Sequence, residues 1–248
     1  MKELRKQADY ITEKAIQAVL PDEAVKRALE GREFNGRVLL VAIGKAAWQM
    51  AKTAREILGD RMDSGIVITK YGHVKDMIDG CECFEAGHPV PDENSFRATE
   101  KAVELVSGLK AEDTVIFLIS GGGSALFEKP LIPGEELQDI TEQLLKSGAS
   151  ITEMNTIRKR LSGVKGGRFA ELCAPAGVYS IVLSDIIGDP LDMIASGPAY
   201  PDSSTSEEAM EIAKKYDLKL SDAYSFPSSP TRPFSFAAES EPSFMSTS

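Results

Sequence analysis

The stretch TVIFLISGGGS, from Thr114 to Ser124, decides the fold. Its first part, TVIFLI, is apolar on both faces of the pleat, which is typical of a strand in a parallel sheet that is covered on both sides. Three glycines let backbone amides turn toward one point, where the start of a following helix adds partial positive charge and two serine hydroxyls add donors. We therefore predict a loop that binds a phosphate or a carboxylate rather than a simple tight turn. The loop consists of Ser120, Gly121, Gly122, Gly123 and Ser124.

The same alternation of strand and helix continues on both sides of this stretch. RVLLVAIG, residues 37–44, is a continuous apolar run, and residues 45–58 return to helical spacing. Further strands are predicted at residues 65–69, 81–86 and 178–183. Strands that alternate with helices in this order predict an α/β protein with a doubly wound, mostly parallel sheet and helices on both faces.

Several helix boundaries can also be predicted. Pro21 divides the first thirty residues into two amphipathic helices, which we expect to act as a lid or support. Asp92 is the predicted N-cap of a helix that reaches about residue 107. Another helix is expected at residues 134–146, and Ser150 with Glu153 forms a capping-box pattern before a helix that ends near Leu161.

Composition and charge exclude some classes of partner. The chain has 248 residues and a formal net charge of -10, which works against sequence-independent binding to nucleic acid or to an anionic membrane. No apolar run is typical of a signal peptide or a membrane span, so we expect a soluble cytoplasmic protein. Cys81, Cys83 and Cys173 lack metal-binding spacing and are interpreted as buried or idle thiols.

The last part of the chain differs in character from the rest. Residues 1–220 are expected to form the α/β domain, whereas residues 221–248 are rich in Ser, Pro and Phe and follow no structural period. Such a composition is typical of a disordered tail. The abrupt change after ordinary helical sequence is also consistent with a frameshift or a fusion artefact.

Two other predicted strands end in residues that suit a ligand site. Lys45 follows Gly44 in the first turn of a helix, where a cation opposes the helix dipole unless an anion lies nearby; a solvated surface lysine is the alternative. Asp185 and Asp189 follow the last strand, and Ser196 lies a few residues further on. Two carboxylates at this spacing can hold Mg²⁺ or accept the proton of a substrate hydroxyl, and they can equally cap a turn.

A cationic segment, NTIRKRLSGVKGG, stands out in an otherwise acidic chain. It holds Arg158, Lys159, Arg160 and Lys165 close together, followed by Gly166 and Gly167. Such a segment can offset the charge of a polyphosphate, and a solvated helix end is the alternative.

Missing motifs and the order of the histidines argue against three enzyme classes. The chain has no G-x-x-x-x-G-K-[ST] sequence and no strand followed by G-x-G-x-x-G, which argues against a P-loop NTPase and a nicotinamide-dependent dehydrogenase. Both histidines, His73 and His88, precede Ser124, which is the wrong order for an α/β-hydrolase triad. His88 lies in GHPVPD, where a substrate contact and a structural turn are both open.

Five motifs together resemble the class II glycerate kinases, also called glycerate 2-kinases. They are VAIGKAA, AGHPVPDENS, ISGGGSAL, NTIRKRLSGVKGGRFA and LSDIIGDPLDMIASGPAYPD. The resemblance as a whole covers about Leu4 to Leu220. The resemblance implies a Rossmann-like N-terminal domain and an enzyme that uses ATP and Mg²⁺ to phosphorylate D-glycerate, giving 2-phosphoglycerate. Members of the family place the active site in a cleft between this domain and a C-terminal one. The resemblance stops near Leu220, so we expect the C-terminal domain to be missing and the chain alone to show little turnover.

The resemblance also implies roles for the candidate residues. The loop from Ser120 to Ser124 would hold the nucleotide phosphates or the glycerate carboxylate. Lys45 would stabilise the transferring phosphoryl group, and Asp189 would orient or deprotonate the glycerate hydroxyl. Asp185 would bind Mg²⁺. The residues assigned to the substrate or its phosphates are Ser120, Gly121, Gly122, Gly123, Ser124, Arg158, Lys165, Gly166 and Ser196.

Two other functions stay open at this point. One is a non-catalytic α/β module that binds a sugar phosphate or a small carboxylate through the same loop. The other is a hydroxypyruvate reductase, a label that some relatives carry and that the missing dinucleotide motif argues against. A face left by a missing second domain can also drive assembly into a homo-oligomer.

Overall fold

A parallel five-stranded sheet forms the centre of the protein, as the sequence predicted. The computed structural model describes residues 2–18, 20–184 and 191–220, so the predicted tail at 221–248 lies outside the described residues. The strand order is β3-β2-β1-β4-β5, and every neighbouring pair is parallel. The strands are β1 Val38–Ile43, β2 Ser64–Lys70, β3 Cys81–Ala86, β4 Thr114–Ser120 and β5 Gly177–Leu183.

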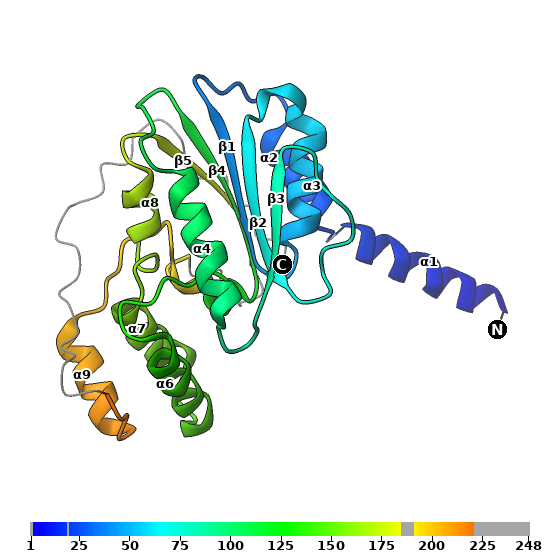
Figure 1. Ribbon diagram of the computed structural model, residues 1–248. Helices are drawn as coiled ribbons and strands as arrows, with labels where there is room; N and C mark the ends of the chain where they lie inside the picture. Colours follow the sequence, from blue (N-terminus) through cyan, green and yellow to red (C-terminus); the bar gives the residue numbers. More distant parts are fainter. Residues whose placement is uncertain (1, 19, 185–190, 221–248) are drawn as a thin grey trace.

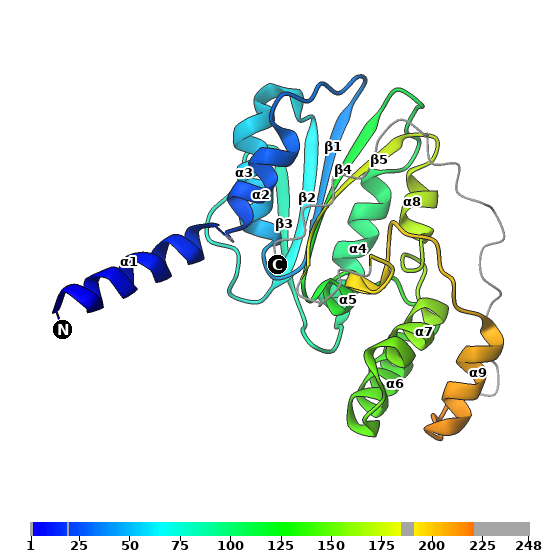
Figure 2. The same cartoon turned by 180° about the vertical axis from the view of Figure 1, so that it is seen from behind.

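Helices cover both faces of the sheet (Figures 1 and 2). On one face, α2 and α3 pack on alternate side chains of β1, and on the other face α4 and α8 pack on the remaining ones. The helices are α1 Lys2–Ala18, α2 Pro21–Leu29, α3 Ala47–Leu58, α4 Glu93–Leu105, α5 Gly123–Leu126, α6 Gly134–Ser147, α7 Ile151–Leu161, α8 Arg168–Cys173 and α9 Ser206–Lys215, with short 3-10 turns η1 Gly59–Arg61 and η2 Ile194–Ser196.

Both faces of the central strands are buried, which explains their unbroken apolar sequences. All six residues of β1 are fully buried. Phe117 of β4 packs against Phe127 and Phe169, with ring centroids 5.9 Å and 4.7 Å away. Each such side chain, fully buried, contributes roughly 1.5–3 kcal/mol of transfer free energy. The apolar runs were therefore a reliable guide to the sheet.

The predicted helix boundaries agree with the structure. Asp92 caps α4 by accepting a hydrogen bond from the Ser95 N–H (3.0 Å), and Ser150 and Glu153 form the expected capping box at α7. Pro21 begins α2, which packs on the sheet and so fits the support role. Helix α1 instead projects away from the body of the protein (Figure 1), and its described side chains, residues 4–14, are exposed.

A second layer of helices lies beyond α4. Helices α6, α7 and α9 share a separate apolar cluster that includes Leu144, Ile157 and Ala213. Helix α9 starts at Thr205, whose side chain accepts from the Glu208 N–H in a third capping box. This layer matters for function because α7 carries much of the cationic segment.

The sheet reverses its order between β1 and β4. From β1 the chain continues to β2 and β3 on one side, and then crosses to β4 and β5 on the other. In open parallel sheets, ligands bind beyond the carboxyl ends of the strands at such a switch point. Ile43 pairs with Ile119, so the two strands end side by side and bring Gly44 next to Ser120.

Candidate functional site

The Lys45 turn and the glycine loop, Ser120 to Ser124, are bonded to each other at the switch point. The Lys45 N–H donates to the Gly121 carbonyl at 2.9 Å. The Ser120 hydroxyl donates to the Ile43 carbonyl and accepts from the Ala46 N–H, both at 3.1 Å. Gly44 makes this contact possible, because a Cβ at this position would lie 2.3 Å from the Ser120 carbonyl oxygen. The two predicted ligand loops therefore form one rigid unit.

The side chains of Lys45 and His88 converge on Gly122. A Cβ at Gly122 would lie 3.1 Å from Cδ2 and Nε2 of the His88 ring and 3.2 Å from Cε of Lys45. Gly122 has φ of +87°, a backbone conformation that residues other than glycine rarely adopt. Lys45 and His88 are both exposed, so an ammonium group and an imidazole border the glycine loop on its solvent side. This arrangement suits an anion.

His73, in the loop that follows β2, supports the same corner. Its Nδ1 lies 2.9 Å from the Lys45 carbonyl oxygen, so Nδ1 carries the proton and donates. The Thr69 hydroxyl reaches the same oxygen at 3.5 Å. These contacts hold the backbone of Lys45 in place while its side chain remains exposed.

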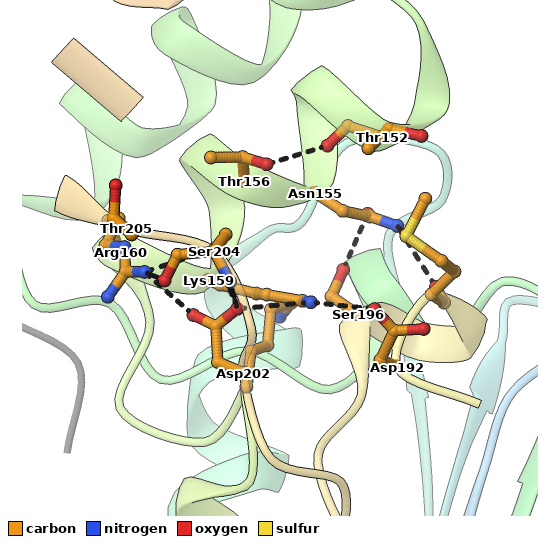
Figure 3. Close-up of polar contacts among 12 residues, drawn as sticks. Thr152, Asn155, Thr156, Lys159, Arg160, Asp192, Ser196, Asp202, Ser204 and Thr205 are labelled. Atoms are coloured by element: carbon orange, nitrogen blue, oxygen red, sulfur yellow. Dashed lines mark hydrogen bonds and ion pairs between the residues drawn. The ribbon is translucent and has the colours of Figure 1, made fainter. Parts of the chain in front are cut away.

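Ser124 is linked to the cationic segment through Ser196. The two hydroxyl oxygens are 3.0 Å apart, and the Ser196 hydroxyl donates to Oδ1 of Asn155 at 2.9 Å. Ser196 and Asn155 are buried, and Figure 3 shows them facing each other across η2 and α7. The structure thus joins three residues that lie far apart in the sequence.

The helix after the glycine loop is shorter than a typical helix. Helix α5 has only 4 residues. It therefore supplies little of the partial positive charge that we predicted from the dipole of a following helix. The hydroxyls of Ser120 and Ser124 are also both engaged inside the protein. The expectation that these hydroxyls act as extra donors for an anion therefore does not match the structure, which leaves backbone amides and the Lys45 and His88 side chains for that task.

The cationic segment is largely buried rather than solvated. Lys159 lies 3.4 Å from Asp202 and 3.6 Å from Asp192, and Arg160 lies 3.1 Å from Asp202 (Figure 3). Arg160 also donates to the Ser204 carbonyl. The side chains of Lys159 and Asp202 are 3% and 1% exposed, so these ion pairs fasten the segment after η2 to α7.

Lys165 lies inside the protein, beside Glu128. Its ammonium donates to a Glu128 carboxylate oxygen at 2.6 Å and to the Phe127 carbonyl at 2.8 Å, and its side chain is fully buried. Burial holds the pKa of Lys165 below its usual value, although Glu128 opposes the shift. The pKa of the half-buried Arg158 is lowered by the same cause. Roles for both residues at the phosphates stay predictions.

The remaining predicted residues divide into two groups. The Gly166 N–H donates to the Ser196 carbonyl at 3.1 Å. Gly166 is buried next to Ser196 and does not lie at the surface of the glycine loop. Asp185 and Asp189 lie outside the described residues, so their predicted roles stay predictions. Among the residues that the structure does describe, no three His, Cys, Asp or Glu side chains are grouped so as to hold a metal ion.

Sequence reasoning missed Asn155, Glu128 and Asp202 as parts of this region. Asn155 and Glu128 lie inside or next to the quoted motifs, yet their types alone did not indicate a partner. Their partners come from segments that are 37 to 43 residues away in the chain. The cysteines match their interpretation, since burial raises the pKa of Cys173 and Cys81 to about 12 and leaves both thiols protonated.

No helix in the described part of the chain is both long and apolar enough to cross a membrane.

Comparisons with known proteins identify close relatives. The family described as "Domain of unknown function (DUF4147)" matches residues 7–225. D-glycerate 2-kinase of Thermotoga maritima is 57% identical over 222 residues, which are 89% of this chain and 53% of that protein. A putative hydroxypyruvate reductase of Agrobacterium vitis is 43% identical over 188 residues, 75% of this chain and 48% of that protein.

A solved structure shows the same fold. The crystal structure of glycerate kinase from Thermotoga maritima matches with a TM-score of 0.85 and 56% identity, over 90% of this chain and 54% of that one. These findings confirm the resemblance to glycerate 2-kinases and the α/β fold. The chain spans about half the length of the curated relatives it matches.

Proposed function

This chain belongs to the DUF4147 family, and we propose that it forms one wall of the active site of an ATP-dependent glycerate 2-kinase. Residues 1–220 are the proposed N-terminal domain. The reaction transfers the γ-phosphoryl group of ATP to D-glycerate and gives ADP and 2-phosphoglycerate. The observation that carries the proposal is the convergence of Lys45 and His88 on Gly122 at the switch point of the sheet.

Phosphoryl transfer depends on positioning and on neutralising charge rather than on covalent chemistry by the protein. The Lys45 ammonium supplies positive charge at the carboxyl ends of β1 and β4. The glycines of the loop allow an anionic group to approach the backbone closely, because no Cβ stands in its path. The Lys45 backbone is held by the bond from its own N–H to Gly121, so the side chain that carries the charge starts at a fixed point beside the loop.

The chemical step assigns one further role. A glycerate hydroxyl oxygen attacks the γ-phosphorus, the bond to the bridging oxygen of ADP breaks, and the hydroxyl proton passes to a base, which we propose to be Asp189. Mg²⁺ would lower the charge of the ATP phosphates, with Asp185 as a ligand. Both aspartates lie outside the described residues, among which no group of three His, Cys, Asp or Glu side chains could hold a metal ion.

Separate titrations with ATP and with D-glycerate test the proposal. We expect both ligands to bind and the Lys45→Ala variant to lose most of its affinity for ATP, because a charge-assisted contact contributes about 1.5–3 kcal/mol. A sugar-phosphate module would ignore ATP, and a reductase would oxidise NADH with hydroxypyruvate. If Lys45→Ala and Asp189→Asn both leave the turnover rate of an intact enzyme unchanged, the assigned roles are wrong.

The hydroxypyruvate reductase alternative receives support only from the names of two relatives. No strand of this sequence is followed by a dinucleotide-binding glycine pattern. We therefore keep the kinase as the proposed function. A cytoplasmic location and a homo-oligomeric state stay predictions.

A further inference from the structure

The orientation of the Asn155 amide can be read from its partners. One end of the amide lies 3.1 Å from the Met193 carbonyl oxygen and 3.7 Å from the Met193 sulfur. Both of these atoms only accept hydrogen bonds, so the NH₂ group must be at that end. The Oδ1 atom is consequently the end that faces Ser196, at 2.9 Å. Asn155 is 1% exposed, so water cannot substitute for these partners.

This orientation determines where the hydroxyl protons of two serines lie. Oδ1 of Asn155 can only accept, so Ser196 uses its single hydroxyl proton to donate to it. The Ser196 oxygen must then be the acceptor in its 3.0 Å contact with Ser124. Ser124 therefore directs its own proton into the protein, toward Ser196. The Ser124 oxygen presents lone pairs alone on its remaining sides.

The hydroxyl proton of Ser120, at the other end of the glycine loop, can be placed in the same way. The Ser120 hydroxyl donates to the Ile43 carbonyl and is 2% exposed. Of the two serines in the loop, only Ser124 is partly exposed. A ligand that reaches Ser124 meets an acceptor, which repels phosphate and carboxylate oxygens and attracts a hydroxyl group.

We propose that Ser124 accepts a hydrogen bond from the alcohol group of the substrate, and that Ser196 and Asn155 are positioning residues that keep Ser124 in the acceptor state. The proposal rests on the proposed function, in which that alcohol belongs to D-glycerate. The residues of the site would then have two different roles. Lys45 and His88 attract the anionic groups, while Ser124 selects ligands that carry a hydroxyl.

The test compares two ligands that differ in their hydroxyl groups. Binding of D-glycerate and of propionate, a three-carbon carboxylate without hydroxyls, is measured on the 248-residue chain by ligand-observed NMR. We expect Ser124→Ala to weaken D-glycerate binding roughly three- to tenfold, as the loss of one neutral hydrogen bond does, and to leave propionate binding within about twofold. Ser124→Thr, which keeps the hydroxyl, should retain the preference.

Ser107→Ala serves as the matched control. It removes a serine hydroxyl that donates to the Val103 carbonyl at the end of α4, so neither ligand should be affected. A wild-type chain that binds no D-glycerate would overturn the proposed function together with this proposal. A wild-type chain that binds D-glycerate, with Ser124→Ala weakening both ligands equally or neither, would overturn this proposal alone.

The Ser196→Ala variant tests the relay itself. It removes the acceptor for the Ser124 proton, so the Ser124 hydroxyl becomes able to donate. We expect inorganic phosphate to bind several-fold more tightly to Ser196→Ala than to wild type, and this gain to vanish in the double variant with Ser124→Ala. The neighbouring Ala195 already occupies a left-handed conformation (φ 52°), so alanine is compatible with this turn. A purely structural role for Ser196 would weaken phosphate binding instead and contradict the proposal.

Discussion

Replacing Gly122 with alanine separates the cost of backbone conformation from the cost of occupying the anion site. Gly122 has φ of +87°, and the left-handed conformation costs an L-residue about 1–2 kcal/mol. The added Cβ would lie 3.1 Å from the His88 ring and 3.2 Å from Lys45 Cε. Both neighbours are ends of exposed side chains, which can move by a few tenths of an ångström at little cost. We therefore expect Gly122→Ala to fold with a free energy of unfolding lower by about 1–2 kcal/mol.

Gly108→Ala is the matched control for this change. Gly108 has φ of +70°, and no atom lies within 4 Å of the position where its Cβ would be. The backbone penalty is thus the same, and no neighbour has to move. Urea unfolding should show similar losses of stability for the two variants, because the His88 and Lys45 side chains can move away from the added methyl group at Gly122.

Ligand binding should distinguish the two variants. The methyl group of Gly122→Ala displaces Lys45 and His88 and occupies the space between them. We expect the affinity for ATP, measured by isothermal titration calorimetry, to fall at least about tenfold, which corresponds to roughly 1.4 kcal/mol. Gly108→Ala should bind ATP as the wild type does. If Gly122→Ala binds both ATP and D-glycerate with unchanged affinity, the anion site does not lie at Gly122.

Three further predictions concern stability. Gly44→Ala should lower the free energy of unfolding far more than Gly122→Ala does, because its Cβ meets the rigid Ser120 backbone at 2.3 Å; equal losses in urea unfolding would contradict this. Glu128→Leu should cost about 3–5 kcal/mol in the same assay by leaving the Lys165 charge buried without its partner, whereas a loss below about 1 kcal/mol would refute a charged pair. The hydrogen bond from the α9 lysine lowers the pKa of Glu153 from 4.5 to about 2. Because the folded-state pKa is the lower one, this stabilisation is present above pH 4.5 and is lost as the pH falls toward 2. Hydrogen exchange of α9 should follow that window, and Glu153→Gln should abolish the dependence.

The fold was predictable because its signals are local. A strand that is buried on both faces needs apolar residues at every position, and TVIFLI and RVLLVAI meet that requirement without reference to any other segment. The capping boxes at Asp92 and Ser150 likewise depend on residues three positions apart. The alternation of strands and helices likewise predicted a doubly wound parallel sheet, whereas the strand order came from the structure.

Part of the predicted site could be located from the sequence, and the roles of its residues stay predictions. The glycine loop and Lys45 could be assigned to one edge of the sheet, because parallel strands end together. The sequence left a solvated helix end as the alternative to a phosphate-binding segment, and burial rules out that alternative for three cations: Lys165 lies beside Glu128, and Lys159 and Arg160 pair with Asp202. Their partners come from separate segments, and no local pattern reveals such a pairing.

The sequence by itself determined that this protein has a buried parallel strand ending in a glycine loop, since both features depend on short-range patterns of apolar residues and glycine. Only the tertiary structure decided what that loop can do. It placed His88 beside Gly122 and connected Ser124 through Ser196 to Asn155. The direction of a hydroxyl proton depends on which acceptors surround it in space, and those acceptors are supplied by segments that the fold brings together.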